Sequence, residues 1–230
     1  SNSFWWSSGT QQGTGTTIIG SGVTAGKIHT RDIGYAQPVL DRTLINQGTL
    51  QHEGGTNGDY NLTLNSGGIL NNQGSYTFVN DVGIDGTSGS IVNTGTFAKT
   101  GGSSVSNITA AFTNNGGTLN ITSGSIVDSA GFSSSGSGAL TGTFKMTGGT
   151  GTLAGTLSGT GTLVLANGSL TANNFTVPGL TQTGGTFTAN GVATQNFSQS
   201  GGILDGTGNL TVSNSFWWSS GTQQGTGTTI

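Results

Sequence analysis

The chain has 230 residues, of which 45 are glycine, 5 are Lys or Arg and 8 are Asp or Glu, for a formal net charge of −3. Glycine at roughly three times its usual frequency excludes long helices, whereas the low net charge and the steady recurrence of Val, Ile, Leu and Phe argue against disorder. The absence of cysteine excludes a disulfide framework and a Cys-based metal site. We therefore expect an all-β protein without cofactors and, since no apolar run approaches about 20 residues, without a membrane span in this segment.

The chain opens with a segment that occurs twice. Residues 1–18, SNSFWWSSGTQQGTGTTI, return unchanged as residues 213–230. We interpret residues 1–212 as one long tandem repeat and residues 213–230 as the start of the next, which predicts a longer native array.

An aromatic strand lies at the start of this segment. Alternation along a strand sends Phe4 and Trp6 to one side and Trp5 to the other. We expect Phe4 and Trp6 in the core, and Trp5 and its second copy, Trp217, outside. An exposed Trp is a candidate contact with a neighbouring rod or a cell-surface glycan, or with a loop of its own chain.

A stretch with more charges follows in residues 20–44. Its charged and titratable residues are Lys27, His29, Arg31, Asp32, Asp41 and Arg42. The opposite charges lie close enough to neutralise each other, which argues against nucleic-acid binding. We expect an outward loop or an irregular coil whose ion pairs fix a contact between neighbouring coils or neighbouring rods.

A shorter period runs through residues 48–210, marked by a turn residue, a polar residue and an apolar residue. The markers are Gly48-Thr49-Leu50, Gly74-Ser75-Tyr76, Gly95-Thr96-Phe97, Gly117-Thr118-Leu119, Gly138-Ala139-Leu140, Gly161-Thr162-Leu163, Gly185-Thr186-Phe187 and Gly208-Asn209-Leu210. Their spacing predicts nine or ten coils of roughly 20–26 residues in each long repeat. Within the coils, apolar and polar residues alternate as in half-buried strands.

Parallel strands joined by crossovers are almost always right-handed, so we expect a right-handed parallel β-helix, or β-solenoid. The marker residues predict one inward stack of Leu119, Leu140, Leu163, Phe187 and Leu210. Asn tolerates left-handed backbone at turns, so an amide ladder is expected at one corner of the coil. Its members would be Asn46, Asn72, Asn93 and Asn115.

Two local groups of residues could carry chemistry. Gln51-His52-Glu53, with Asp59 nearby, contains the residue types that cleave polysaccharides in some β-helix enzymes. Adjacent strand residues point to opposite faces, and the two glycines that follow indicate a turn, so we favour a solvated turn and no catalytic residues. Asp81 and Asp85 flank a glycine as in a calcium loop, but a lone carboxylate pair is a weak cation site, and we expect no metal.

Four segments carry a resemblance to a known style of repeat. They are SFWWSSGTQQGTGTTI (3–18), LDRTLINQGTL (40–50), FVNDVGIDGTSGSIVNTGTFAKTGG (78–102) and FTNNGGTLNITSGSI (112–126). They resemble the long β-strand repeats of giant bacterial surface proteins, which include adhesins, filamentous haemagglutinin-like proteins and autotransporter passengers. The chain departs from that pattern at Trp5 and Trp217, where the family has a small polar residue, and in the stretch 20–44.

The resemblance implies a secreted β-solenoid at the cell surface, with no activity attached. Our leading hypothesis is a non-catalytic structural repeat of an extracellular bacterial filament, sheath or stalk, whose partners are other copies of the same repeat. One alternative is the stalk of a large surface adhesin. A more distant alternative is a polysaccharide-cleaving β-helix enzyme.

Overall fold

The computed structural model describes residues 3–30, 36–54, 61–86 and 88–230, and within these ranges the chain forms strands and turns without any helix. The strands are β1 (Trp5–Trp6), β2 (Gly9–Ile19), β3 (Gly26–Thr30), β4 (Pro38–Asn46), β5 (Thr49–Gly54), β6 (Asn61–Leu64), β7 (Ile69–Asn72), β8 (Ser75–Phe78), β9 (Gly83–Asp85), β10 (Ser90–Asn93), β11 (Thr96–Lys99), β12 (Val105–Ile108), β13 (Ala111–Asn114), β14 (Thr118–Ile121), β15 (Ser125–Asp128), β16 (Phe132–Ser134), β17 (Ser137–Leu140), β18 (Thr143–Met146), β19 (Thr150–Gly159), β20 (Thr162–Leu165), β21 (Ser169–Gln182), β22 (Thr186–Asp205) and β23 (Leu210–Gln223).

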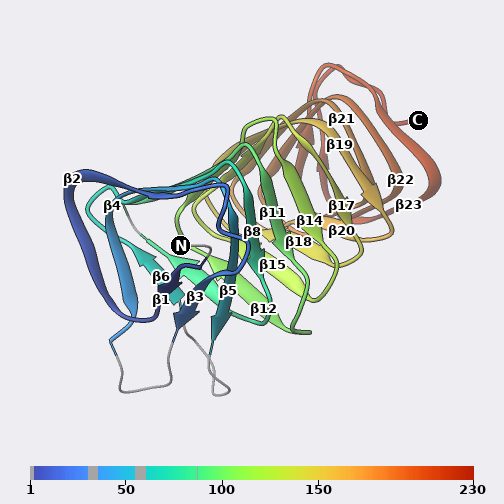
Figure 1. The fold of residues 1–230 in the computed structure, drawn as a ribbon. Coiled ribbons are helices and arrows are strands. Elements are labelled where there is room, and N and C mark those ends of the chain that lie inside the picture. Colours follow the sequence, from blue (N-terminus) through green and yellow to red (C-terminus); the bar gives the residue numbers. More distant parts are fainter. Residues whose placement is uncertain (1–2, 31–35, 55–60, 87) are drawn as a thin grey trace.

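The strands stack as successive coils along one axis, with β1 to β5 towards one end and β22 and β23 at the other (Figure 1). Three faces surround the interior, and the chain visits them in order. Face 1 contains β1, β3, β5, β8, β11, β14 and β17; face 2 contains β6, β9, β12, β15, β18 and β20; face 3 contains β7, β10, β13 and β16. The longer strands β2, β4, β19, β21, β22 and β23 bend through corners and contribute to more than one face.

Every pairing between the described strands is parallel, and the chain makes about ten turns. The expected all-β parallel β-solenoid is therefore confirmed. The local reason is the alternation that the sequence shows: β6, β7 and β8, one from each face, share the same pattern of outward and fully buried residues. Burying one large aliphatic or aromatic side chain is worth roughly 1.5–3 kcal/mol, so each coil depends on the coils above and below it.

The coils become shorter towards the C-terminus. Asn46 and Asn72, which are backbone partners on neighbouring coils near the start of the chain, are separated by 26 positions in the sequence. Asn173 and Asn190, which are partners in the same sense near the end, are separated by only 17. The expected coil lengths therefore fit the first coils and are too long for the last ones. Shorter corner loops account for the difference, because the paired strand segments keep a similar length.

The five residues expected in one inward stack are all buried, but they do not form one stack. Leu119 and Leu140 both lie on face 1, yet Leu119 pairs with Gly138, and Leu140 pairs with Ile121. Leu163 lies on face 2 and Phe187 on face 3, whereas Leu210 pairs with Val192 on face 1. The prediction of a single stack was wrong because the marker occurs at different corners of successive coils.

The interior also contains the expected amide ladder, with one change of register. The side-chain Nδ2 groups of Asn46, Asn72 and Asn93 each donate to the Oδ1 of the next ladder residue, over 2.6–2.7 Å, and Asn114 is the last amide. Asn115, the residue expected there, is exposed. The ladder residues are buried strand residues, and the only described non-glycine residues with positive φ are Ser66 and Asn174, so left-handed backbone is not the reason for the ladder.

Candidate contact surface

Trp5 is the centre of a polar and aromatic cluster on the outside of face 1. Alternation along β1 leaves Trp5 59% exposed and buries Trp6, while Phe4 packs partly buried against the core. The Trp5 ring stacks on His29 of the next coil, with ring centroids 5.3 Å apart and planes 25° apart. Lys27, the backbone partner of Trp5, places its Nζ 5.8 Å from the centroid of the Trp5 ring.

Glu53 of β5 joins these side chains from the following coil. Its carboxylate accepts hydrogen bonds from Lys27 Nζ at 2.9 and 3.1 Å and lies 3.0 Å from His29 Nδ1. Partial burial raises the pKa of Glu53, but the hydrogen bonds and charges of Lys27 and His29 outweigh it and hold that pKa below its ordinary value. The outer cluster of Trp5, Lys27, His29 and Glu53 therefore links three successive coils through an aromatic stack and an ion pair.

The charged residues expected in a contact loop lie mostly on strands. Lys27 belongs to β3, and Asp41 and Arg42 belong to β4, where Arg42 Nε donates to the backbone oxygen of Gly15 at 2.9 Å. His29 also lies on β3. Arg31 and Asp32 lie outside the described residues. Reasoning from the sequence paired these charges with each other and missed Glu53, which the stacking of β3 on β5 brings next to Lys27.

His52 and Glu53 were expected in a solvated turn, but they lie on the strand β5. Their side chains point to opposite sides of this strand, as alternation predicts. His52 is fully buried, with its Nδ1 2.8 Å from the Tyr76 hydroxyl, and burial lowers its pKa to about 3. A neutral imidazole inside the core and a carboxylate on the outside do not form an acid and base pair. Asp59 lies outside the described residues.

The two carboxylates of the calcium-like stretch bind to other protein groups. Asp81 accepts a hydrogen bond from the buried Lys99 Nζ at 2.7 Å, and Asp85 accepts one from Asn61 Nδ2 at 2.8 Å. Alternation in β11 is the signal that could have located Lys99 inside, two positions after the inward Phe97. Across the part of the chain that the structure describes, no group of three His, Cys, Asp or Glu side chains could hold a metal ion.

The second copy of the aromatic strand lies at the opposite end of the solenoid, in β23. Trp217 is 65% exposed and pairs with Ser198 of the preceding coil, while the Phe216 ring stacks on Phe197 with centroids 5.6 Å apart and planes 3° apart. Trp218 is 53% exposed, whereas Trp6, the same position in the first copy, is only 7% exposed. The difference arises because β3 covers β1, whereas residues 228–230 pair only with the start of β23, at Leu210 and Val212, and leave its aromatic residues uncovered.

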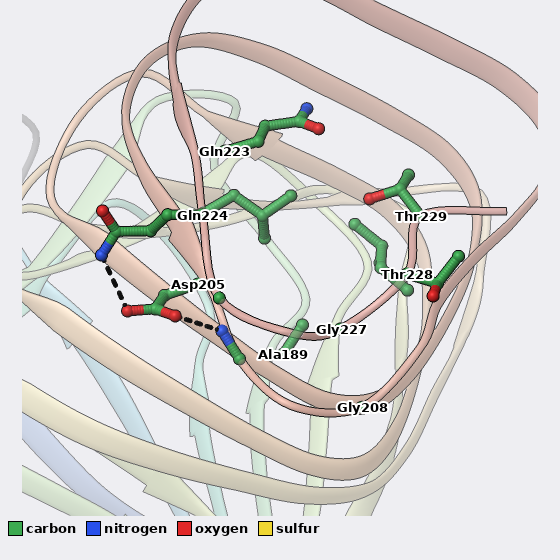
Figure 2. Close-up of a pocket in the computed structure, with 12 residues that line it drawn as sticks. Ala189, Asp205, Gly208, Gln223, Gln224, Gly227, Thr228 and Thr229 are labelled. Carbon is green, nitrogen blue, oxygen red and sulfur yellow. Dashed lines mark hydrogen bonds between the residues drawn. The ribbon is translucent and has the colours of Figure 1, made fainter.

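The same end carries a cavity of about 360 Å³ between the last coils. Asp205 lies in its wall and accepts hydrogen bonds from the Gln224 side chain at 2.9 Å and from the Gly206 backbone at 2.7 Å (Figure 2). Much of the rest of the wall is glycine, threonine and the apolar residues Ala189, Leu204 and Leu210. The cavity is the open end of the solenoid interior.

Searches against protein-family models, curated proteins and solved structures found no match for this chain. The described residues also contain no helix that is long and apolar enough to cross a membrane.

Proposed function

We propose that this chain is a non-catalytic structural protein whose long tandem repeats, each equivalent to residues 1–212, stack end to end into an extracellular bacterial filament, sheath or stalk. The observation that supports this most directly is the behaviour of the segment that occurs twice. In one copy it pairs with the coil that follows it, and in the other copy it pairs with the coil that precedes it.

The two sets of contacts are compatible with one coil inside a continuous stack. In the first copy Ile28 pairs with Trp6 and covers it, and the backbone N–H of Lys27 donates to the Phe4 oxygen at 2.8 Å. In the second copy the equivalent side of β23 is open and exposes Trp218. A further copy of the repeat would cover Trp218 as Ile28 covers Trp6. The extracellular setting of the proposal comes from the resemblance to surface-protein repeats.

Chains that contain one, two and three fused copies of the repeat test this function. Strands in neighbouring coils lie about 4.8 Å apart, so some ten coils should lengthen the rod by roughly 50 Å for each added copy. Electron microscopy and small-angle X-ray scattering measure that length. Particles that widen, or that remain the same length as copies are added, would contradict the proposal.

The adhesin alternative is favoured by one observation, the outer cluster around Trp5. An exposed aromatic ring beside a carboxylate, a lysine ammonium group and an imidazole offers a stacking surface and hydrogen-bonding groups, which are the features that bind sugars. Microscopy of the native assembly separates the two hypotheses. Isolated rods that end in a distinct head would favour the adhesin, whereas polymers or bundles favour the structural fibre.

A further inference from the structure

The two identical copies of the aromatic strand lie on different faces of the solenoid. Trp5 pairs with Lys27, and the outward residues that continue this column belong to face 1. They are Gln51, Thr77, Ala98, Asn120, Ala139 and Ser158. Trp217 pairs with Ser198, and the column behind it belongs to face 2. That column contains Thr181, Val164, Lys145, Val127 and Asn107.

The residues that follow the aromatic strand are displaced in the same way between the two copies. In the first copy the strand continues into Gly9–Gln12, which pairs with Pro38–Asp41, and Val39 in turn pairs with Thr63 on face 2. In the second copy, Thr222 and Gln223 come at the corresponding distance after the aromatic residues, and they pair with Ile203 and Leu204, beyond face 2. The whole segment is thus shifted by one face.

The same segment can lie on different faces because each face requires the same pattern of residues. A strand of about four residues with alternating outward and inward positions satisfies any of them, as β6, β7 and β8 show. The segment therefore carries no information that ties it to one face. The position of the segment is decided by the coil beneath it, through contacts such as the stack of Phe216 on Phe197.

We propose that each tandem repeat is rotated by one face relative to the repeat before it. This inference rests on the proposed function, in which the repeat recurs. One long repeat corresponds to a whole number of coils plus one face, so the coil after β23 places the next Lys27 against Trp217 on face 2. Every later strand of that repeat follows, one face further on, and the original orientation returns after three repeats.

The rotation determines what kind of partner the outer cluster can contact. Successive Trp5-type side chains point in three directions around the rod, about 50 Å apart along it. A flat partner that lies along one side of the rod meets one such cluster in every three repeats. The arrangement fits further copies of the same rod, packed around it on three sides, and it does not fit a two-dimensional ribbon.

Pairs of introduced cysteines test the rotation in the 230-residue chain, which has no cysteine of its own. Neighbouring parallel strands bring backbone partners within the Cα separation that a disulfide spans, about 4.4–6.8 Å. Outward pairs at Trp5→Cys with Lys27→Cys and at Ser198→Cys with Trp217→Cys should both form intramolecular disulfides on oxidation. The control pair is Val164→Cys with Thr181→Cys. These two residues are backbone partners on face 2 and lie outside the segment that occurs twice.

The same-face arrangement is tested by the pair Gln195→Cys with Trp217→Cys, because Gln195 lies two residues after Ala193 of face 1, just as Ser158 of the Trp5 column lies two residues after Thr156. We expect this pair to remain reduced while the Ser198 pair oxidises to the extent of the control. A disulfide at Gln195, or no disulfide at Ser198 while the control pair oxidises, would overturn the rotation. Neither result would affect the lengthening of fused chains, so the inference and the proposed function can fail independently.

Discussion

Asp128 is a buried carboxyl group inside an otherwise apolar part of face 2. It stacks between Ile108 and Met146, its Oδ1 accepts a hydrogen bond from the Gly131 backbone at 2.7 Å, and its Oδ2 has no partner. Burial raises the pKa of Asp128 to about 6, although the backbone hydrogen bonds of Gly131 and Ala130 act in the opposite direction. Ionisation at neutral pH therefore destabilises the fold.

The sign of this effect predicts the behaviour of Asp128→Asn. Because the folded-state pKa lies above the unfolded value of 3.8, protonation of Asp128 stabilises the fold fully below pH 3.8, and this contribution is lost as the pH rises through about 6. We expect Asp128→Asn to raise the free energy of unfolding at pH 8 by about 2 kcal/mol and to change it little near pH 4. Thermal unfolding at both pH values measures this. Asp205→Asn, at a surface carboxylate, should give no gain at pH 8.

His52 and Tyr76 form a second buried polar pair, and among the described residues each is the only side-chain hydrogen-bond partner of the other, while both rings also pack against Phe78. Replacing either one, by His52→Phe or Tyr76→Phe, leaves the remaining polar group unpaired in the core and should cost about 1–3 kcal/mol. The double variant removes both groups and should be more stable than either single variant. Chemical denaturation of the four proteins checks this. Additive losses would show that the hydrogen bond contributes nothing.

The same pair predicts sensitivity to acid. The pKa of His52 falls to about 3 in the fold, below its ordinary value of 6.5, because burial disfavours the charged ring. The stability that depends on a neutral His52 is complete above pH 6.5 and is lost as the pH falls towards 3. The double variant should therefore unfold at a lower pH than the natural chain. Circular dichroism during acid titration measures the midpoint.

At the scale of an element, the amide ladder is the polar counterpart of the stacked apolar columns. Each amide bridges to the coil above and also donates to a backbone oxygen at the corner, as Asn72 Nδ2 does to Thr96 at 2.8 Å. The buried donors and acceptors are thus paired along the axis. Because neighbouring amides depend on each other, removal of a central member affects two coils.

Asn93→Ala should therefore destabilise the chain by about 2–4 kcal/mol, since it removes the acceptor of one Asn72 Nδ2 hydrogen bond and the donor to Asn114 Oδ1. Asn115→Ala is the matched control, because Asn115 lies one residue beyond the ladder and is exposed, and its change should stay within about 0.5 kcal/mol. Denaturant unfolding compares the two variants. Equal losses would mean that the ladder adds no stability beyond that of its backbone.

At the scale of the whole molecule, the exposed Trp5 and Trp217 are the proposed contacts between rods. Trp5 contacts His29 and Lys27 of its own chain, and an exposed contact of this kind is worth about 1 kcal/mol or less. The double variant Trp5→Thr with Trp217→Thr should therefore remain folded and lose side-by-side association of rods. Light scattering and microscopy measure assembly. Val105→Thr, another exposed apolar position, is the control, and unchanged assembly of the double variant would exclude a lateral role for Trp5.

The amino-acid sequence alone determines the local features of this protein. The period of two identifies short strands and their inward residues, so the burial of Leu62, Leu64 and Leu163 and the outward position of Trp5 could be predicted. The identity of residues 1–18 and 213–230 is likewise visible without coordinates. These features depend on neighbours in the chain, because side-chain direction in a strand is set by the backbone itself.

Only the tertiary structure decided which residues of successive coils lie against each other. The sequence separation between partners on neighbouring coils falls from 26 to 17 along the chain, and each change in a corner loop moves the register without altering the strand pattern. For that reason Asn114 and not Asn115 completes the ladder, Glu53 meets Lys27, and Trp217 lies on a different face from Trp5. The alternation of a strand depends only on the strand itself, whereas the register of each coil depends on the lengths of all the loops that precede it.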